Sequence, residues 1–281
     1  MKIGYFGFNN GPLGNPEDMR RILSALDNSG FESAWTGEHV VLVDPQEPPS
    51  PVPPEFPMVD TVAALAFAAG LTENLMLGSG IILLAQRNPV VLAKELTGID
   101  VLSSGRLIFG VGVGYVKHEF DTIGVPYEER GPRTSEHIEV IRALWSQDKP
   151  VFDGQFTKIG GIQQKPMPVQ KPHPPIVVGG MSVAGHRRAL EHANGWYGFA
   201  LSVEDTEQAL QSIDRERDRV DRPASLGELE ISVTPRGVVS VDDAKRFADL
   251  GVERLILMPG APDLDGILRF IDGCDRTLTS L

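Results

Sequence analysis

Cysteine is almost absent from this chain of 281 residues, since Cys274 is the only one. A single thiol excludes an internal disulfide and a metal site built from cysteines, and it suits a reducing compartment. No apolar run reaches membrane-spanning length, and residues 1–6 read as a strand rather than a signal peptide. We therefore expect a cytoplasmic protein.

Positive charge is also scarce. The chain has 26 lysine and arginine residues against 38 aspartate and glutamate residues, which gives a formal net charge of −12. A surface of this sign repels the phosphate backbone of a nucleic acid and an anionic membrane. We expect neither as a partner, and we expect a small-molecule substrate instead.

Several sequence motifs of catalysis are missing. The six histidines form neither H-x-H nor H-E-x-x-H, so the sequence offers no ligand set for a zinc hydrolase. No G-x-S-x-G and no P-loop occur either. The sequence predicts no metal site, and it gives no support to these hydrolase and nucleotide-binding chemistries.

What the sequence does contain is a regular alternation of strand-like and helix-like segments. Short β-rich runs lie near residues 2–8, 33–37, 75–84, 106–111, 174–179, 196–201, 228–234 and 253–258. Helical spacing follows near residues 16–29, 58–71, 89–102, 132–147, 183–194, 204–221, 241–250 and 264–278. Eight strands, each followed by a helix, predict an α/β fold, a (β/α)8 TIM barrel formed as one domain by residues 1–281. An open doubly wound sheet is the alternative that the count alone leaves open.

Two segments exceed what a minimal barrel needs. A proline-rich stretch runs from Asp44 to Pro57, and an irregular stretch runs from Lys149 to Pro175. The first follows the second predicted strand, which places it at the carboxyl end of the barrel, where barrel enzymes keep their sites. It is either a lid or a substrate wall of that site, or a surface loop stiffened by proline.

The second predicted strand leads into Glu38 and His39. A carboxylate and an imidazole can both move protons near neutral pH once their surroundings tune them. Their position at the carboxyl end of a barrel strand favours a catalytic role over a structural one. Both are therefore candidate catalytic residues.

Glycine is concentrated near the ends of two further strands. Gly78 and Gly80 lie in the third strand, and Gly110, Gly112 and Gly114 end the fourth. Glycine inside a strand marks a bulge or a close approach by a ligand. The spacing in the fourth strand is not the G-x-G-x-x-G of a dinucleotide site, and no acidic residue on a following strand completes that motif.

The clearest candidate phosphate site is the turn after the fifth strand. Residues 175–178 are apolar, and Gly179, Gly180 and Met181 then lead into a helix. Amides at the amino terminus of a helix bind anions when no side chain obstructs them. The alternative is a tight turn that needs glycine only for its geometry.

Taken together, these motifs resemble the luciferase-like monooxygenase superfamily, and most closely its short members that use coenzyme F420. The resemblance covers nearly the whole chain, and its most specific part runs from Arg87-Asn88-Pro89 to Gly114. Further matching blocks are Glu119-Phe120, Gly124-Val125-Pro126, Glu129-Arg130-Gly131, Phe152-Asp153-Gly154, Pro172-His173-Pro174-Pro175 and Gly179-Gly180.

The resemblance implies a barrel whose flavin or deazaflavin ring lies at the carboxyl mouth, with a cis peptide bond between Gly80 and Ile81 beside it. The expected cofactor-binding residues are His39, Gly80, Ile81, Gly112, Gly114, Gly179, Gly180 and Met181. Tyr115 stands where some sugar-phosphate dehydrogenases of the superfamily have a catalytic glutamate, so that activity is not expected. Glu38 stands where deazaflavin relatives usually have aspartate.

These implications predict an oxidoreductase in which reduced coenzyme F420 passes a hydride to a small organic acceptor, while Glu38 or His39 manages a proton. The alternative is an FMN-dependent monooxygenase supplied with reduced FMN by a separate reductase. A cofactor-binding barrel without activity is a third hypothesis. Helix 58–71 has few polar positions, which predicts a homodimer formed through the helices on that side.

Overall fold

The computed structural model describes residues 1–261 and 263–279, and its strands form a closed barrel. The strand order is β3-β2-β1-β11-β10-β9-β8-β5-β4, every neighbouring pair is parallel, and an additional pairing of β3 with β5 closes the ring. Since β3 and β4 both pair with β5, they fill one position, and the barrel has eight. This confirms the predicted (β/α)8 fold and excludes the open sheet. The strands are β1 (Lys2–Phe6), β2 (Ser33–Trp35), β3 (Met76–Gly78), β4 (Ile82–Leu83), β5 (Leu107–Gly112), β8 (Ile176–Gly179), β9 (Gly195–Leu201), β10 (Glu230–Pro235) and β11 (Arg254–Leu257).

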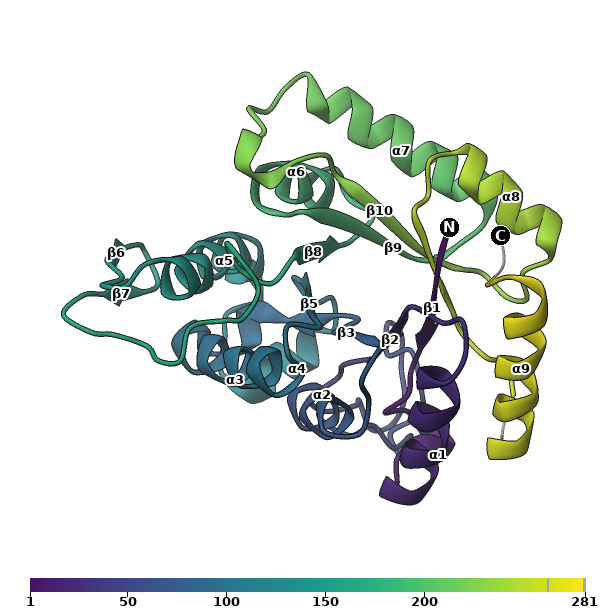
Figure 1. The fold of residues 1–281 in the computed structure, drawn as a ribbon. Helices are drawn as coiled ribbons and strands as arrows, with labels where there is room; N and C mark the ends of the chain where they lie inside the picture. The colour runs from purple at the N-terminus through teal and green to yellow at the C-terminus, as the bar shows by residue number, and fades with distance from the viewer. Residues whose placement is uncertain (262, 280–281) are drawn as a thin grey trace.

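Helices surround the strands (Figure 1). One follows each of the eight barrel positions, as the sequence predicted. These helices are α1 (Pro16–Asp27), α2 (Thr61–Ala69), α3 (Pro89–Leu102), α5 (Arg130–Ser146), α6 (Val183–His192), α7 (Val203–Arg217), α8 (Val241–Asp249) and α9 (Leu264–Thr277). The structure adds α4 (Lys117–Ile123) and the short 3-10 helices η1 (Gly11–Leu13), η2 (Leu84–Gln86), η3 (Tyr127–Glu129) and η4 (Ala224–Leu226). No helix within the described ranges is long and apolar enough to cross a membrane.

Local sequence fixes where most of these helices begin. A side-chain oxygen accepts a hydrogen bond from a first-turn amide in seven of them, and each bond satisfies a donor that has no partner within the helix. Ser202 and Ser240 form complete capping boxes with the aspartates three residues later. The seven capping residues are Asn15, Asp60, Asn88, Ser182, Ser202, Ser240 and Asp263.

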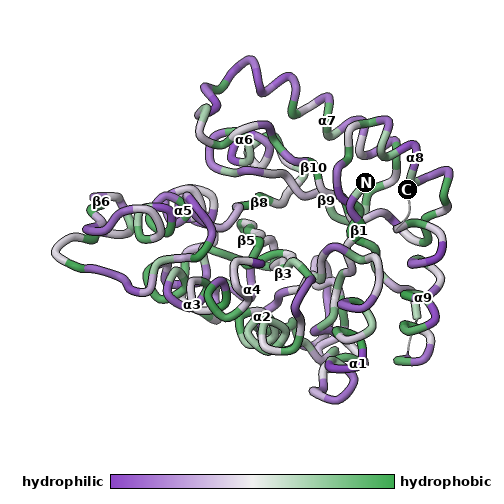
Figure 2. Tube along the Cα trace, viewed as in Figure 1, coloured by the Kyte–Doolittle hydropathy of each residue, from purple (hydrophilic) through white to green (hydrophobic). Residues whose placement is uncertain are grey.

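The apolar side chains form two buried clusters on the two sides of the barrel wall. The larger cluster fills the space between strands and helices. In Figure 2 the strands near β5 and β8 are largely green, whereas the outer helix α7 carries much purple. The smaller cluster lies inside the barrel and consists of Phe6, Trp35, Ile108, Val177, Tyr197 and Ile256. The interior of the barrel is therefore filled by side chains, and a ligand site is expected at its carboxyl mouth.

Ion pairs close the amino end of the barrel. Arg254 begins β11 and is 3% exposed, and its guanidinium donates to both carboxylate oxygens of Glu32 at 2.9 Å. It also pairs with Glu230, which begins β10. Because parallel strands all run the same way, the opposite end of the barrel is the one that remains for a ligand.

The second long insertion is more ordered than predicted. Residues 149–175 contain a two-stranded antiparallel hairpin, β6 (Phe152–Asp153) with β7 (Lys158–Ile159). Farther along, the fully buried carboxylate of Asp100, near the end of α3, accepts the amides of Val169 and Gln170. The Gln170 side chain also donates to the carbonyl of Leu107, the first residue of β5. This part of the insertion is thus held at the amino end, away from the mouth.

Candidate active site at the barrel mouth

Glu38 lies in the loop after β2 and is buried, with 3% of its side chain exposed. Its Oε1 accepts hydrogen bonds from the Leu83 amide and from Nε of Arg87, each at 3.1 Å. Burial raises the pKa of the Glu38 carboxyl group, and the charge of Arg87 opposes that rise. Oε2 is buried as well and has no hydrogen-bond partner among the described residues. Glu38 therefore has one hydrogen-bonded oxygen and one buried oxygen without a partner among the described residues.

Arg87 connects Glu38 to the start of a helix. Its Nη2 donates to Oδ2 of Asp60 at 2.8 Å, while the other oxygen of Asp60 caps α2 through the Ala63 amide. One guanidinium thus joins the loop after β2, the first turn of α2 and the start of α3. Sequence reasoning quoted Arg87 only as part of a family motif and assigned it no role.

His39 is held from three directions. Its Nδ1 lies 3.2 Å from Oε2 of Glu119, a fully buried carboxylate in the first turn of α4. The same carboxylate accepts the amide of Val40 through Oε1 at 3.0 Å. The Tyr115 ring meets the imidazole edge to face with centroids 5.8 Å apart, and the His39 amide contacts the sulfur of Met58. Sequence reasoning matched Glu119 to the family but did not place it beside His39.

The peptide bond between Gly80 and Ile81 is cis, which confirms the prediction. The Ile81 side chain occupies the space in front of Gly112 at the end of β5 and Gly179 at the end of β8, where an added Cβ on either glycine would overlap its Cδ1. A Cβ on Gly80 would lie 2.7 Å from the carbonyl oxygen of Thr36. Four predicted cofactor residues therefore meet in one wall, in which the Ile81 side chain packs over Gly112 and Gly179.

Gly114 lies apart from that wall. Its φ of +79° suits glycine, and an added Cβ would lie 2.8 Å from the ring of Phe120 on α4. The structure thus gives Gly114 a packing role over Phe120, whereas Gly112, two residues earlier, contacts Ile81. A direct cofactor contact from Gly114 remains a prediction.

The turn between β8 and α6 is open to a ligand. Gly180 has a φ of +128° with free space around its Cα, and the Met181 side chain is 45% exposed. The Gly180 carbonyl accepts the indole N–H of Trp196 at 2.9 Å, which fixes the turn. Ser182 caps α6 by accepting the Gly185 amide, which leaves other first-turn amides without an intrahelical partner.

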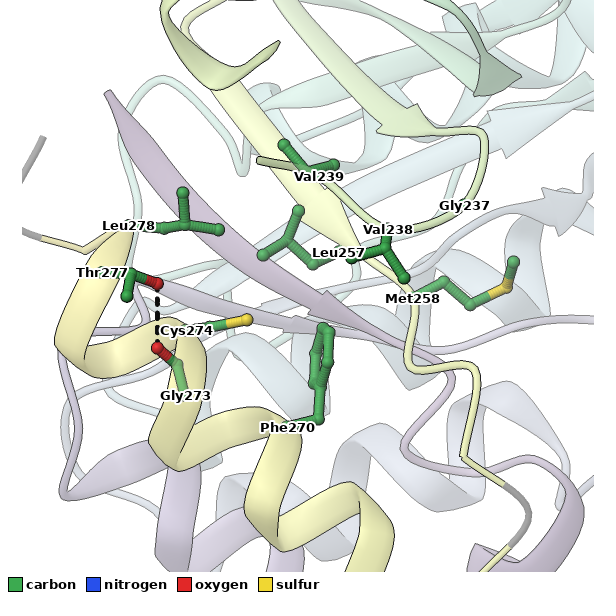
Figure 3. Close-up of a pocket in the computed structure, with 10 residues that line it drawn as sticks. All are labelled: Gly237, Val238, Val239, Leu257, Met258, Phe270, Gly273, Cys274, Thr277 and Leu278. Carbon is green, nitrogen blue, oxygen red and sulfur yellow. Dashed lines mark hydrogen bonds between the residues drawn. The ribbon is translucent and has the colours of Figure 1, made fainter. Parts of the chain in front are cut away.

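Of two cavities in the structure, one borders the candidate site. One of about 440 Å³ is lined by residues 41–45 of the loop after β2 and by His118, Glu119 and Thr122 of α4, so it adjoins the His39–Glu119 pair. The other, of about 200 Å³, lies between the end of β11, residues 237–239 and α9 (Figure 3). Its wall includes Leu257 and Phe270, which pack with the helix-facing cluster. It contains none of the predicted site residues.

A parallel (β/α)8 barrel with polar residues at its carboxyl mouth has the architecture of a barrel enzyme. Residues 1–264 match the model of the luciferase-like monooxygenase family, and the chain belongs to this family of oxidoreductases.

Three curated relatives illustrate the range of the family. An uncharacterized protein of Mycobacterium tuberculosis is 29% identical over 248 residues and covers 84% of each chain. The 5,10-methylenetetrahydromethanopterin reductase of Methanopyrus kandleri is 24% identical over 273 residues, which is 92% of this chain and 73% of the reductase. The FMNH2-dependent dimethylsulfone monooxygenase of Pseudomonas putida is 34% identical over 129 residues, which is 45% of this chain and 36% of that one.

Solved structures share the fold over almost the full chain. The monooxygenase RslO1 of Streptomyces bottropensis superposes with a TM-score of 0.79 at 20% identity and covers 100% of this chain and 99% of its own. An F420-dependent secondary alcohol dehydrogenase superposes with a TM-score of 0.78 at 17% identity and covers 96% and 97%. At this identity the likeness concerns the fold alone.

We predict that Arg87→Met destabilises the protein by about 3–5 kcal/mol, because it leaves the buried Glu38 carboxylate without its counter-charge. Arg236→Met is the matched control, since Arg236 is 66% exposed and its pair with Asp205 should contribute about 0–1 kcal/mol. Denaturant unfolding of both variants measures the difference. Equal losses of unfolding free energy in the two variants would show that Arg87 does not compensate the charge of Glu38.

The same variant should acquire a distinctive pH dependence. Without Arg87 the pKa of Glu38 rises further above its ordinary value of 4.5, so the folded chain holds a proton that the unfolded chain has already lost. The free energy of unfolding of Arg87→Met should therefore fall, relative to wild type, as the pH rises from 4.5. A difference that does not change with pH would contradict this account.

Proposed function

We propose that the protein is a coenzyme F420-dependent oxidoreductase that transfers a hydride between the cofactor and a small organic substrate. The observation that carries this proposal is the wall formed by Gly80, Ile81, Gly112 and Gly179 at the mouth of the barrel. The partly buried Ile81 side chain covers Gly112 and Gly179 and offers a flat ring an apolar surface to pack against. Polar groups that can carry protons, Glu38 and His39, lie in the neighbouring loop.

Two groups of residues would have separate roles in this reaction, one in proton transfer and one in binding the cofactor phosphate. A bound deazaflavin would supply two electrons and one hydrogen as a hydride. Glu38 or His39 would give the acceptor the proton that completes its reduction, or take it back in the reverse direction. The amides around Gly180, Met181 and the first turn of α6 would hold a phosphate, and the favourable end of the helix dipole lies at the same place.

The second candidate is an FMN-dependent monooxygenase that receives reduced FMN from a separate reductase. The sulfone monooxygenase of Pseudomonas putida favours it, because its matched segment has the higher identity. The match to the Methanopyrus kandleri reductase covers twice as much of this chain, 92% against 45%. This greater coverage, together with the adjacent Glu38 and His39, supports coenzyme F420 as the cofactor.

Titration with the two cofactors under matched conditions tests the proposal. We expect coenzyme F420 to bind at least about tenfold more tightly than FMN, a difference of about 1.4 kcal/mol. Ala184→Asp, which adds a negative charge to the exposed first turn of α6, should weaken binding of either phosphate-bearing cofactor. FMN binding tenfold more tightly than F420 would transfer the assignment to the monooxygenase.

We predict that His39→Ala folds normally but lowers turnover by roughly a hundredfold or more, the usual contribution of a positioned acid–base group. Glu38→Gln should cause a similar loss of turnover if the unpartnered Oε2 moves the proton. The loss should be smaller if the Glu38 carboxylate acts only electrostatically. Steady-state rates with a verified substrate measure both effects, with circular dichroism as the folding control. Full activity of His39→Ala would remove this residue from the mechanism.

We also propose a homodimer formed through α2 and α3, which pack against each other. Val62, Ala66 and Phe67 of α2 are only partly buried, and Leu102 at the end of α3 is 66% exposed. Leu102→Glu should shift a dimer towards monomer in light scattering at micromolar concentration. Val238→Glu is the control, because this side chain is 89% exposed on the loop after β10. A wild-type protein that is monomeric at this concentration refutes the proposal.

A further inference from the structure

We propose that Glu119 is a positioning residue that fixes His39 in the tautomer with the proton on Nδ1. This inference concerns a residue for which the proposed function has no role. The orientation of the ring follows from the geometry alone, whereas the use of the ring in proton transfer rests on the proposed function.

One carboxylate, that of Glu119, holds both the backbone and a side chain of the loop after β2. Glu119 accepts the Val40 amide at 3.0 Å through Oε1 and contacts Nδ1 of His39 at 3.2 Å through Oε2. Its own side chain is fully buried, and that of His39 is 10% exposed. The loop after β2 therefore cannot shift without breaking bonds to a group that water does not reach.

The contact between Glu119 and His39 also determines which ring nitrogen carries the proton. A carboxylate oxygen can only accept a hydrogen bond, so with Glu119 as a carboxylate the 3.2 Å contact places the proton on Nδ1. A neutral imidazole carries one proton, and Nε2 is then left with a free lone pair. Oriented histidines in acid–base and metal sites are fixed by the same kind of second partner. Glu119 thus leaves Nε2 as the nitrogen that can exchange a proton with a ligand.

The other carboxylate nearby is held by other groups through one of its two oxygens. Glu38 is adjacent to His39 in sequence, but its Oε1 is bonded to the Leu83 amide and to Arg87. Arg87 in turn is shared with Asp60. In the described part of the chain, no lysine or arginine nitrogen lies within 4.0 Å of Glu119, and the side-chain contact that it makes is with Nδ1 of His39. The two acidic residues consequently have different tasks.

Histidine ¹⁵N and long-range ¹H–¹⁵N NMR spectra of the full chain test the proposal without any cofactor. The chain has six histidines, and the signals of His39 are identified by their loss in His39→Asn. We expect the Nδ1–H tautomer of His39 to predominate in the wild type by about tenfold or more, as a hydrogen bond to a charged group implies. A predominant Nε2–H tautomer in the wild type overturns the proposal, and this result needs no variant to fold.

Glu119→Gln supplies the second arm. Glutamine can still accept the Val40 amide, but its NH2 group is a donor and opposes the Nδ1 proton. We expect the tautomer ratio of His39 to move towards Nε2–H by about tenfold, the equivalent of losing the same bond. Glu47→Gln is the matched control, since Glu47 faces His118 at 3.9 Å on the exposed surface of the same region. A shift in both variants, or in neither, refutes the assignment.

Binding of coenzyme F420, followed by the change in its fluorescence, separates this proposal from the proposed function. If F420 does not bind while the His39 tautomer responds to Glu119→Gln as described, the function fails and the positioning role stands. If F420 binds and the tautomer does not respond, the positioning role fails alone.

Discussion

The buried carboxylate of Glu38 at the mouth of the barrel requires a nearby positive charge, and Arg87 provides it. The guanidinium reaches Glu38 in the loop after β2 and Asp60 at the start of α2, while its own backbone leads into α3. His39 and the Gly80–Ile81 peptide lie within the segments that these contacts connect. The arrangement of the mouth therefore depends on one residue that need not touch a ligand itself.

The two ends of the barrel differ in how their polar groups are satisfied. At the amino end, the buried guanidinium of Arg254 is paired with both Glu32 and Glu230. At the mouth, Thr36 Oγ1, Glu38 Oε2 and the amide of Gln86 are buried without a partner among residues 1–261 and 263–279. Buried polar atoms normally have a hydrogen-bond partner, whether protein, water or ligand. The contrast agrees with a structural amino end and a mouth prepared for binding.

The alternation of short apolar runs and amphipathic segments predicted eight strand–helix units, because both periodicities are local. The count alone left an open doubly wound sheet as the alternative, and the family resemblance favoured the barrel. Residues 75–84, predicted as one strand, are divided into β3 and β4 around Gly80–Ile81. The seven-residue α4 and the hairpin of the second insertion have too little periodicity to be recognised. The contact of Arg87 with Glu38 joins residues 49 positions apart, and that of Glu119 with His39 joins residues 80 positions apart. These contacts form only when the barrel closes, so no local sequence pattern predicts them.

A crystal structure of the protein with coenzyme F420 tests the central claim most directly. The account predicts the deazaflavin ring against the Gly80–Ile81 peptide, within reach of His39, and the cofactor phosphate at the amides that follow Gly179. A ring bound outside the mouth, or a phosphate held by the loops after β10 and β11, would contradict it.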